Sequence, residues 1–226
     1  MHENNGQNVG TKTQPPSKRI RIFMNGLSLE LPAGENMIQT IGVIGAGQMG
    51  NGIAQVAACA GYDVVMIDIK DEYVEKGLGT IQFSLGKLVS KERMTQADAD
   101  AALARIKTGT ERSMCADCDL VVEAVPEVLS LKQDIFTELD SICKPETILA
   151  SNTSSISITT IAASTQRPEK VIGMHFMNPV PIMKLVEIIN GAQTSEATNS
   201  AVVEAAETMG KTCLLYTSPS PRDGIG

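Results

Sequence analysis

Two side chains separated by a rigid turn give this sequence a candidate proton-transfer pair. His175 precedes the segment 178–181, which reads Asn-Pro-Val-Pro, and Glu187 follows it. The prolines cannot continue a strand or a helix, so we expect a fixed turn beside the imidazole. A carboxylate that accepts from one ring nitrogen fixes the tautomer and stabilises the imidazolium, leaving the other nitrogen to remove a hydroxyl proton. A lone histidine is more often structural, but the turn and the returning glutamate favour a general base.

A glycine-rich run earlier in the chain has the spacing of a dinucleotide-binding loop. The run is Gly45-Ala46-Gly47-Gln48-Met49-Gly50. The first glycine permits a tight turn, the second lets the backbone approach a pyrophosphate, and the third lets the following helix lie close to the strand. Asp68 ends the next apolar stretch, where a carboxylate accepts from ribose hydroxyls and repels a 2′-phosphate. The sequence therefore predicts NAD rather than NADP; the alternative is a structural glycine turn beside a surface aspartate.

The elements that must position these residues follow from an alternation of two patterns. Short apolar stretches predict strands at 38–44, 63–68, 119–123, 147–151, 171–175 and 184–189. Apolar residues at steps of three and four predict helices at 53–60, 74–88 and 131–142. Apolar strands that alternate with helices indicate an α/β fold with a Rossmann-like, doubly wound, mostly parallel sheet.

Four stretches of the sequence resemble the short-chain L-3-hydroxyacyl-CoA dehydrogenase family, most closely its bacterial 3-hydroxybutyryl-CoA type. They read IGVIGAGQMGNGIAQ, ADCDLVVEA, ICKPETILASNTSSISIT and RPEKVIGMHFMNPVPIMKLVE, and the last two are far more specific than the glycine loop. The resemblance covers residues 40 to about 212. It implies NAD-dependent oxidation of L-3-hydroxyacyl-CoA to 3-oxoacyl-CoA, or the reverse reduction, with 3-hydroxybutyryl-CoA as the expected substrate.

The same resemblance implies roles for individual residues. It implies His175 as the general base, Glu187 as its orienting partner, and Ser154 as the group that hydrogen-bonds the substrate oxygen at C3. Positions expected at the cofactor are the glycine-loop residues, Asp68, Glu127, Lys132, Asn152, Ser154 and Asn178. Positions expected at the acyl-CoA are Ser84, Lys91, Lys132 and Ser154.

Two of these assignments have structural alternatives. Ser84 and Lys91 share one face of the expected helix, which is also what an ordinary solvated face would show. Ser154 is also placed to cap a helix that follows the strand 147–151.

The family also has a helical C-terminal domain that begins after a Pro-Gly-Phe stretch and supplies a catalytic asparagine. No such stretch follows Thr212. We therefore expect that domain, which completes the substrate cleft and forms the homodimer of the intact enzyme, to be absent. This leaves open an NAD-binding module without catalysis. A related 3-hydroxyacid dehydrogenase that does not use CoA is disfavoured, because its helical catalytic lysine is not found.

The two ends of the chain differ from residues 37–212, which we expect to be the NAD-binding domain. Residues 1–36 are rich in Asn, Gly, Gln, Pro and Lys, which predicts a non-native or disordered extension before Met37. Within them, 19–31 suits a hairpin around Asn25-Gly26. Residues 213–226 have no helical period and resemble the translation of a sequencing adapter, which predicts a foreign tail.

Composition excludes several classes of function. The net charge of −7 argues against nucleic acid as a partner, and no apolar run reaches the roughly 18–20 residues that cross a bilayer. The N-terminus lacks a secretory pattern. The five cysteines are too scattered for a disulfide framework, and Cys115-Ala-Asp-Cys118 has no second pair, so no metal is expected. These features predict a cytoplasmic protein with reduced thiols.

Overall fold

The computed structural model describes residues 19–24, 27–32 and 38–216, and the chain divides into two compact units, 1–37 and 38–226. In the first unit, β1 (Arg19–Met24) and β2 (Leu27–Pro32) pair as antiparallel strands, in agreement with the predicted hairpin. The Asn25-Gly26 turn lies outside the described residues, as do most of the expected N-terminal extension and the expected tail beyond Tyr216.

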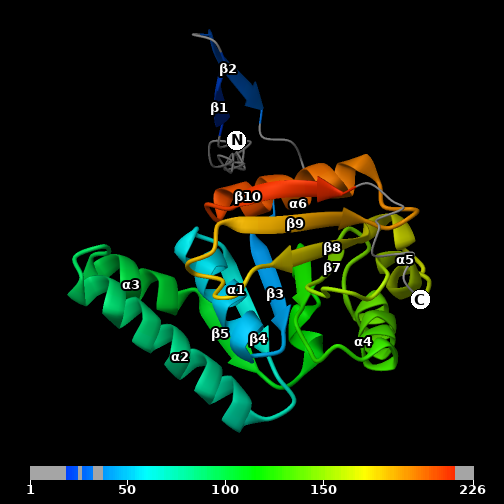
Figure 1. The fold of residues 1–226 in the computed structure, drawn as a ribbon, viewed down its shortest axis with the longest axis horizontal. Helices are drawn as coiled ribbons and strands as arrows, with labels where there is room; N and C mark the ends of the chain where they lie inside the picture. The colour runs from blue at the N-terminus through cyan, green and yellow to red at the C-terminus, as the bar shows by residue number, and fades with distance from the viewer. Residues whose placement is uncertain (1–18, 25–26, 33–37, 217–226) are drawn as a thin grey trace, which may run out of the picture. The chain divides into compact units, whose positions relative to one another are not determined.

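The second unit is built on one sheet of eight strands with the order β10-β9-β8-β7-β6-β3-β4-β5 (Figure 1). The strands are β3 (Thr40–Ile44), β4 (Asp63–Ile67), β5 (Ile106–Gly109), β6 (Leu120–Glu123), β7 (Ile148–Ser151), β8 (Val171–Phe176), β9 (Leu185–Asn190) and β10 (Thr212–Tyr216). All neighbouring pairs are parallel except β8 and β9, which run antiparallel. The predicted mostly parallel, Rossmann-like sheet is therefore confirmed.

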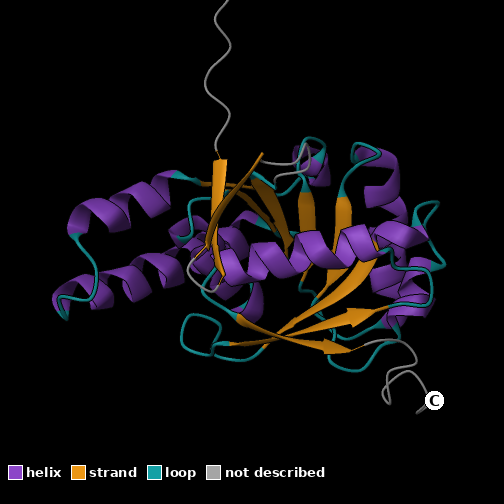
Figure 2. Cartoon of the chain, turned by 90° about the horizontal axis from the view of Figure 1, so that it is seen from above, coloured by secondary structure: helices purple, strands orange, loops and turns teal. Residues whose placement is uncertain are grey.

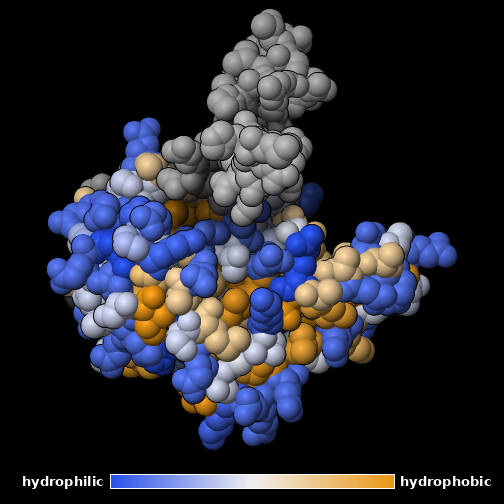
Figure 3. Space-filling model, turned by 180° about the vertical axis from the view of Figure 1, so that it is seen from behind, coloured by the Kyte–Doolittle hydropathy of each residue, from blue (hydrophilic) through white to orange (hydrophobic). Residues whose placement is uncertain are grey.

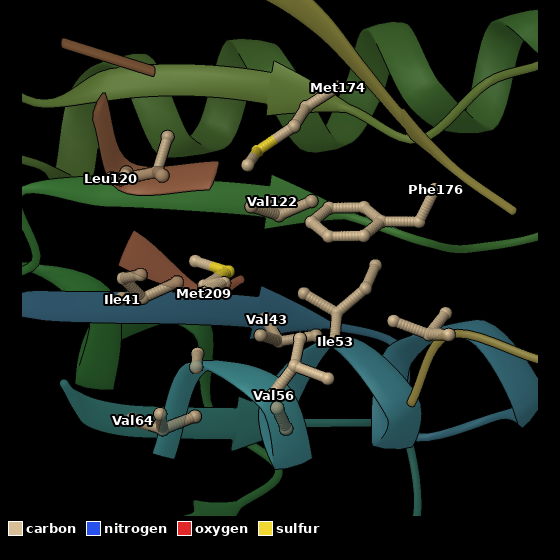
Figure 4. Close-up of a cluster of buried hydrophobic side chains, with 14 of the residues drawn as sticks. Ile41, Val43, Ile53, Val56, Val64, Leu120, Val122, Met174, Phe176 and Met209 are labelled. Carbon is tan, nitrogen blue, oxygen red and sulfur yellow. The ribbon is translucent and has the colours of Figure 1, made fainter. Parts of the chain in front are cut away.

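Helices cover both faces of this sheet (Figure 2). They are α1 (Gln48–Cys59), α2 (Asp71–Ser90), α3 (Gln96–Ala104), α4 (Leu129–Ile142), α5 (Ile158–Ala162) and α6 (Glu196–Thr208). Helices α1, α2, α3 and α6 contribute to one apolar cluster, whereas α4 and α5 contribute to another. Figure 4 shows part of the first cluster, with Ile53 and Val56 of α1 against Val43 of β3.

Successive strand residues alternate between the two clusters, which explains why these strands are apolar throughout. Val43 belongs to the first cluster and Ile44 to the second, and Met66 and Ile67 of β4 divide in the same way. Side chains of a strand point to opposite faces in turn, so a sheet covered on both faces needs apolar residues at every position. None of the described helices is long and apolar enough to cross a membrane.

The structure adds elements that the sequence pattern did not predict. These are strands β5 and β10 and helices α3 and α6, whereas α5 lies where a helix after the strand 147–151 was considered. The expectation that the strands end at residue 189 was therefore wrong, because Thr212–Tyr216 pairs in parallel with β9. The long helix expected to start near residue 74 begins at Asp71 and ends at Ser90.

Candidate functional site

The carboxyl ends of β3, β4, β6, β7 and β8 lie at one edge of the sheet, because these strands run in the same direction. In doubly wound sheets, this edge holds the ligand. The loops that leave it carry most of the residues singled out in the sequence. They include the glycine loop after β3, Asp68 after β4, Asn152 and Ser154 after β7, and His175 near the end of β8.

The glycine loop has the tight geometry that its spacing predicts. Gly45 has φ +101°, a conformation that L side chains rarely adopt, and its N–H donates to the Ile67 carbonyl at 2.7 Å. A Cβ on Gly50 would lie 1.6 Å from the Gly45 carbonyl oxygen. The third glycine is therefore required by the turn itself, in addition to the helix–strand packing that the motif predicts.

Gly47 differs from its two neighbours, because a Cβ there would meet nothing within 4 Å. It is exposed and lines a cavity of about 950 Å³ together with Gly45, Ala46, Gln48 and Asp68. Space above a glycine at the start of a helix is what a pyrophosphate needs in order to approach backbone N–H groups. The loop and the cavity therefore fit a dinucleotide.

Asp68 lies in the wall of this cavity, as expected for a residue near the adenosine ribose. Its Oδ2 accepts from the Ala46 N–H at 2.7 Å, and its Oδ1 accepts from the Ile69 N–H at 2.7 Å. The carboxylate thus also ties the end of β4 to the glycine loop. Its negative charge in the cavity wall disfavours a 2′-phosphate.

Several cavity residues were not foreseen from the sequence. Tyr73 and Lys76 come from α2, and Thr110 and Arg112 follow β5. Recognising β5 would have directed attention to Thr110 and Arg112, since the residues after a parallel strand reach the same edge. Met49 and Gly50 do not line the cavity: Met49 packs against the apolar cluster and Gly50 is buried beneath the turn.

His175 and Glu187 face each other across β8 and β9 in the antiparallel register. Nδ1 of His175 lies 2.8 Å from Oε2 of Glu187, and the exposed fractions of these side chains are 16% and 6%. With the carboxylate accepting, Nδ1 carries the proton and Nε2 has the lone pair. The sequence placed these residues on consecutive strands, and the structure brings them into direct contact.

The turn between the two strands is held from both sides. The Pro179 carbonyl accepts from the N–H groups of Ile182 and Met183 at 3.0 and 2.9 Å. On the other side, the ammonium of Lys211 donates to the carbonyls of Val180 and Met183. Lys211 is buried, and burial lowers its pKa. The predicted fixed turn beside the imidazole is therefore present.

Glu187 has a second polar neighbour. The Tyr216 hydroxyl donates to Oε1 of Glu187 at 3.1 Å, from the last described residue of β10. The carboxylate that faces His175 is thus bound on both of its oxygens.

Ser154, Asn152 and Asn178 lie outside the lining of the cavity. The Asn152 Oδ1 accepts from the Phe176 N–H at 2.9 Å, which joins the loop after β7 to the end of β8. Ser154 is exposed in that loop, and Asn178 is exposed in the turn after β8. The Ser154 N–H donates to Oε1 of Glu127 at 2.9 Å.

Glu127 and Lys132 make internal contacts with each other. Lys132 is 1% exposed, and its Nζ lies 2.7 Å from Oε1 of Glu123 and 3.3 Å from Oε2 of Glu127. Glu123 is completely buried and also accepts from the Ser151 hydroxyl at 2.6 Å. Lys132, expected at both the cofactor and the acyl-CoA, is thus enclosed and engaged by carboxylates in the structure. Nothing in the sequence pattern marked Glu123 except its charge at the end of an apolar strand.

Two structural alternatives are also resolved. The residue that caps α5 is Ser157, whose hydroxyl accepts from the Thr160 N–H, so the reading of Ser154 as a helix cap was wrong. The expected shared helical face of Ser84 and Lys91 also needs correction. Ser84 lies within α2, but Lys91 is its exposed C-cap residue with φ −99° and ψ 12°, because the helix ends at Ser90.

Among the described residues, no group of His, Cys, Asp and Glu side chains is arranged to hold a metal ion. Cys115, Cys118 and Cys143 are buried free thiols in the apolar cluster beneath α4. Burial raises the pKa of Cys143 to about 11, so this thiol stays protonated at neutral pH.

Residues 40–218 match the family described as "3-hydroxyacyl-CoA dehydrogenase, NAD binding domain". The chain is 57% identical over 173 residues to a probable 3-hydroxybutyryl-CoA dehydrogenase of Deinococcus radiodurans, covering 76% of this chain and 62% of that protein. It is 51% identical over 175 residues to the 3-hydroxybutyryl-CoA dehydrogenase of Bradyrhizobium diazoefficiens, covering 77% and 60%.

Solved structures give the same result. The (S)-3-hydroxybutyryl-CoA dehydrogenase of Ralstonia eutropha superposes with a TM-score of 0.78 and 49% identity, covering 80% of this chain and 64% of that one. The chain thus spans about three fifths of the length of these relatives.

Proposed function

The chain belongs to the 3-hydroxyacyl-CoA dehydrogenase family, and on that premise we propose that it is the NAD-binding part of an enzyme that interconverts L-3-hydroxyacyl-CoA and 3-oxoacyl-CoA. The four-carbon substrate, 3-hydroxybutyryl-CoA, is favoured by the names of the relatives cited above. NAD is the cofactor of the family's domain, in agreement with the loop, the cavity and Asp68.

The observation that carries the proposal is the His175–Glu187 contact at the ligand-binding edge of the sheet. When bound, NAD supplies a hydride acceptor for the oxidation. Nε2 of His175 takes the proton of the substrate hydroxyl, while Glu187 keeps the proton on Nδ1 and stabilises the imidazolium that forms. In the reverse direction the same nitrogen returns the proton.

The residues of the neighbouring loops take supporting roles in this proposal. Ser154 donates its hydroxyl to the oxygen at C3 of the substrate, which fixes the reacting carbon relative to His175. Asn152 and Asn178 line the space next to the imidazole, and the contact between Asn152 and the Phe176 N–H supports this placement. Ser84 and Lys91, on and just after α2, are proposed to contact the CoA.

Exposed apolar side chains next to the site support the proposal that a further domain covers it in the intact enzyme. Val128 and Leu129 follow Glu127 and are 50% and 39% exposed, and Ile182 and Met183 of the turn are 75% and 40% exposed. Figure 3 shows apolar surface among the polar residues on the face opposite to that of Figure 1. We propose that a C-terminal domain of the intact enzyme covers these apolar side chains. We also propose that the intact enzyme dimerises through that domain and acts in the cytoplasm.

An assay with acetoacetyl-CoA and NADH tests the proposal. We expect the full-length gene product to oxidise NADH, with little turnover when NADPH replaces it, and the His175→Gln variant to lose most of this activity. The absence of turnover by the full-length protein would refute the proposed reaction. A preference for NADPH would refute the role given to Asp68.

A second candidate, an NAD-binding module without catalysis, is favoured by the coverage of about three fifths of the relatives' length. The same assay applied to this chain and to the full-length gene product separates the two. Turnover by the full-length protein supports the dehydrogenase even where this chain alone is inactive, whereas NAD binding without turnover by either protein supports the module.

A further inference from the structure

One carboxylate oxygen of Glu127 accepts four hydrogen bonds from residues 153–155 in the loop after β7. Oε1 of Glu127 accepts from the N–H groups of Ser154 at 2.9 Å and Ser155 at 3.2 Å. It also accepts from the hydroxyl groups of Thr153 and of Ser155, the latter at 3.1 Å. Glu127 comes from a different loop, between β6 and α4, so these bonds join two connections that are distant in sequence.

The Thr153 hydroxyl completes the turn. Its oxygen accepts from the N–H groups of Ser155 at 3.3 Å and Ile156 at 2.9 Å while its proton goes to Glu127. The backbone on both sides of Ser154 is therefore fixed by one anion and by one hydroxyl that the anion orients.

The other oxygen of Glu127 is held by a buried charge network. Lys132 lies between Oε2 of Glu127 and Oε1 of Glu123, and the far oxygen of Glu123 accepts from Ser151 at the end of β7. Two carboxylates share one ammonium, so the group has a net charge of −1 when all three are ionised. Burial raises the pKa of Glu127, but Thr153, Lys132 and the Ser154 N–H outweigh burial and place this pKa below its ordinary value. Glu127 is therefore ionised at neutral pH.

We propose that Glu127 is a positioning residue, whose carboxylate, aimed by Lys132 and Glu123, shapes the turn at 153–156 and thereby fixes the orientation of Ser154. This rests on the proposed function only for the role of Ser154. It also gives Lys132 a role consistent with its burial, because its ammonium orients the carboxylate of Glu127. Hydrogen bonds to a charged acceptor are stronger and shorter than neutral ones, so a carboxylate suits a turn that must not move.

Amide signals of this chain in solution test the proposal without any need for turnover. In Glu127→Gln, which keeps the shape and an acceptor oxygen but loses the charge, we expect the Ser154 and Ser155 amide protons to move upfield and to exchange about tenfold faster. Lys132→Met should shift the same two signals by a smaller amount. The Thr160 and Thr198 amides, which donate to the hydroxyls of Ser157 and Ser195, serve as internal controls and should not move.

The resemblance also places Glu127 at the cofactor, and calorimetric titration with NAD measures that role separately. If Glu127 acts only through the turn, the NAD affinity of Glu127→Gln changes less than about threefold, whereas a larger loss together with shifted amides shows that the carboxylate also contacts the cofactor. Unchanged Ser154 and Ser155 amides would overturn the proposal, and so would a loss of NAD affinity without a change in these amides. If Glu127→Gln does not fold, Glu127→Asp decides: it keeps the charge but withdraws it by one methylene, and the same two amides must shift.

A failure of the dehydrogenase assay combined with shifted amides would refute the proposed reaction and leave the positioning role intact. Turnover in the dehydrogenase assay combined with unchanged amides would support the proposed reaction and refute the positioning role.

Discussion

At the scale of single residues, the contact between His175 and Glu187 leads to a prediction about rate. In the full-length enzyme, His175→Gln should lower kcat by about 10²- to 10⁴-fold, because the base is lost. Glu187→Gln should lower kcat by about tenfold, because a neutral amide replaces an ionised acceptor at Nδ1. Steady-state kinetics and NAD titration are the measurements, and NAD affinity should be retained in both variants.

Glu169→Gln is a matched control for these variants, because Glu169 is an exposed carboxylate at the opposite end of β8. It should leave kcat unchanged. Full activity of His175→Gln would exclude His175 as the base.

Two glycines of the loop, Gly47 and Gly50, should lose different properties when each is replaced by alanine. Gly50→Ala should lower the thermal midpoint strongly, because its Cβ would lie 1.6 Å from the Gly45 carbonyl oxygen. Gly47→Ala should leave the midpoint nearly unchanged but weaken NAD binding, because its methyl group meets no protein atom within 4 Å and points into space that the cofactor needs. Differential scanning calorimetry and NAD titration measure the two effects.

Gly86→Ala is the control for the glycine series. Gly86 lies in α2, and a Cβ added there would have nothing within 4 Å. Alanine in place of glycine within a helix should raise the free energy of unfolding by about 0.5–1 kcal/mol. Equal loss of NAD affinity in Gly47→Ala and Gly86→Ala would contradict the assignment of the open space to a ligand.

How far single residues are predictable depends on the range of their contacts. The glycine loop, Asp68, His175 and Glu187 belong to local motifs, so the sequence indicates both the residue and its partner. The bonds from Glu127 to Ser154 and from Lys132 to Glu123 join separate loops and strands, and no local spacing indicates them.

At the scale of elements, Asp119 joins the N-terminal ends of β3 and β6 by hydrogen bonds. It precedes β6, and its Oδ2 accepts from the N–H groups of Gln39 and Thr40 at 2.8 and 2.9 Å, while Oδ1 accepts from Lys144 at 2.5 Å. Burial raises the pKa of Asp119, but these donors lower it more, to below the ordinary 3.8. The Asp119 carboxylate therefore binds a proton less readily in the folded state than in the unfolded state.

The resulting prediction concerns stability against pH. Asp119→Asn should lower the free energy of unfolding at pH 7 by about 1–3 kcal/mol, measured with urea. Because the folded pKa is depressed, this contribution is complete above the ordinary pKa of 3.8 and is lost as the pH falls through the lower, folded value. Asp117→Asn, at an exposed neighbour, should show no such difference, and a difference between wild type and Asp119→Asn that grows on acidification would contradict the argument.

The turn between β8 and β9 gives a second prediction at this scale. Lys211→Met removes the ammonium but keeps the length of the side chain, so the carbonyls of Val180 and Met183 lose their donor. We expect the Ile182 and Met183 amides to exchange about tenfold faster in hydrogen-exchange experiments. Lys184→Met, at an exposed residue of the same turn, is the control, and equal exchange in both variants would show that Lys211 does not hold the turn.

Two of the elements missed by the sequence pattern, β5 and α3, have few large apolar residues. β5 lies at the edge of the sheet and has only one large apolar residue, Ile106, so its pattern is not that of a buried strand. The buried residues of α3 are the alanines Ala99 and Ala102, which produce little helical periodicity in hydrophobicity. Central strands and helices with large apolar stripes were predictable because burial on both faces or on one face determines their composition.

At the scale of the whole molecule, the division at residues 37 and 38 leads to a prediction about truncation. A chain consisting of Met followed by residues 38–226 should unfold at the same thermal midpoint and bind NAD with the same affinity as the chain of 226 residues. The physical reason is that the described residues that line the cavity and form the two apolar clusters lie in the second unit. Calorimetry and NAD titration are the measurements, and a lower midpoint or weaker binding in the shortened chain would contradict independence of the second unit.

The fold class was predictable from the alternation of strands and helices, whereas the order of strands was not. Nothing in the local pattern shows that β8 and β9 are antiparallel, or that Thr212–Tyr216 adds a strand to their edge. These pairings depend on which apolar faces are left uncovered when the remaining elements have packed.

The position of β3 in the sheet has a consequence for the order in which the protein can be assembled during synthesis. β3 pairs with β4 on one side and with β6 on the other, so β4 and β5, which are made before residue 110, lie on one side of it and the later strands of this sheet lie on the other. A nascent chain that has reached the end of β5 can form three of the eight strands of this sheet, with one edge of β3 still open. That edge closes only when β6 leaves the ribosome, and the histidine and its glutamate follow later still. The pocket for the nucleotide is thus begun by the first strands to emerge, whereas the groups proposed to act on the substrate are set in place by the last.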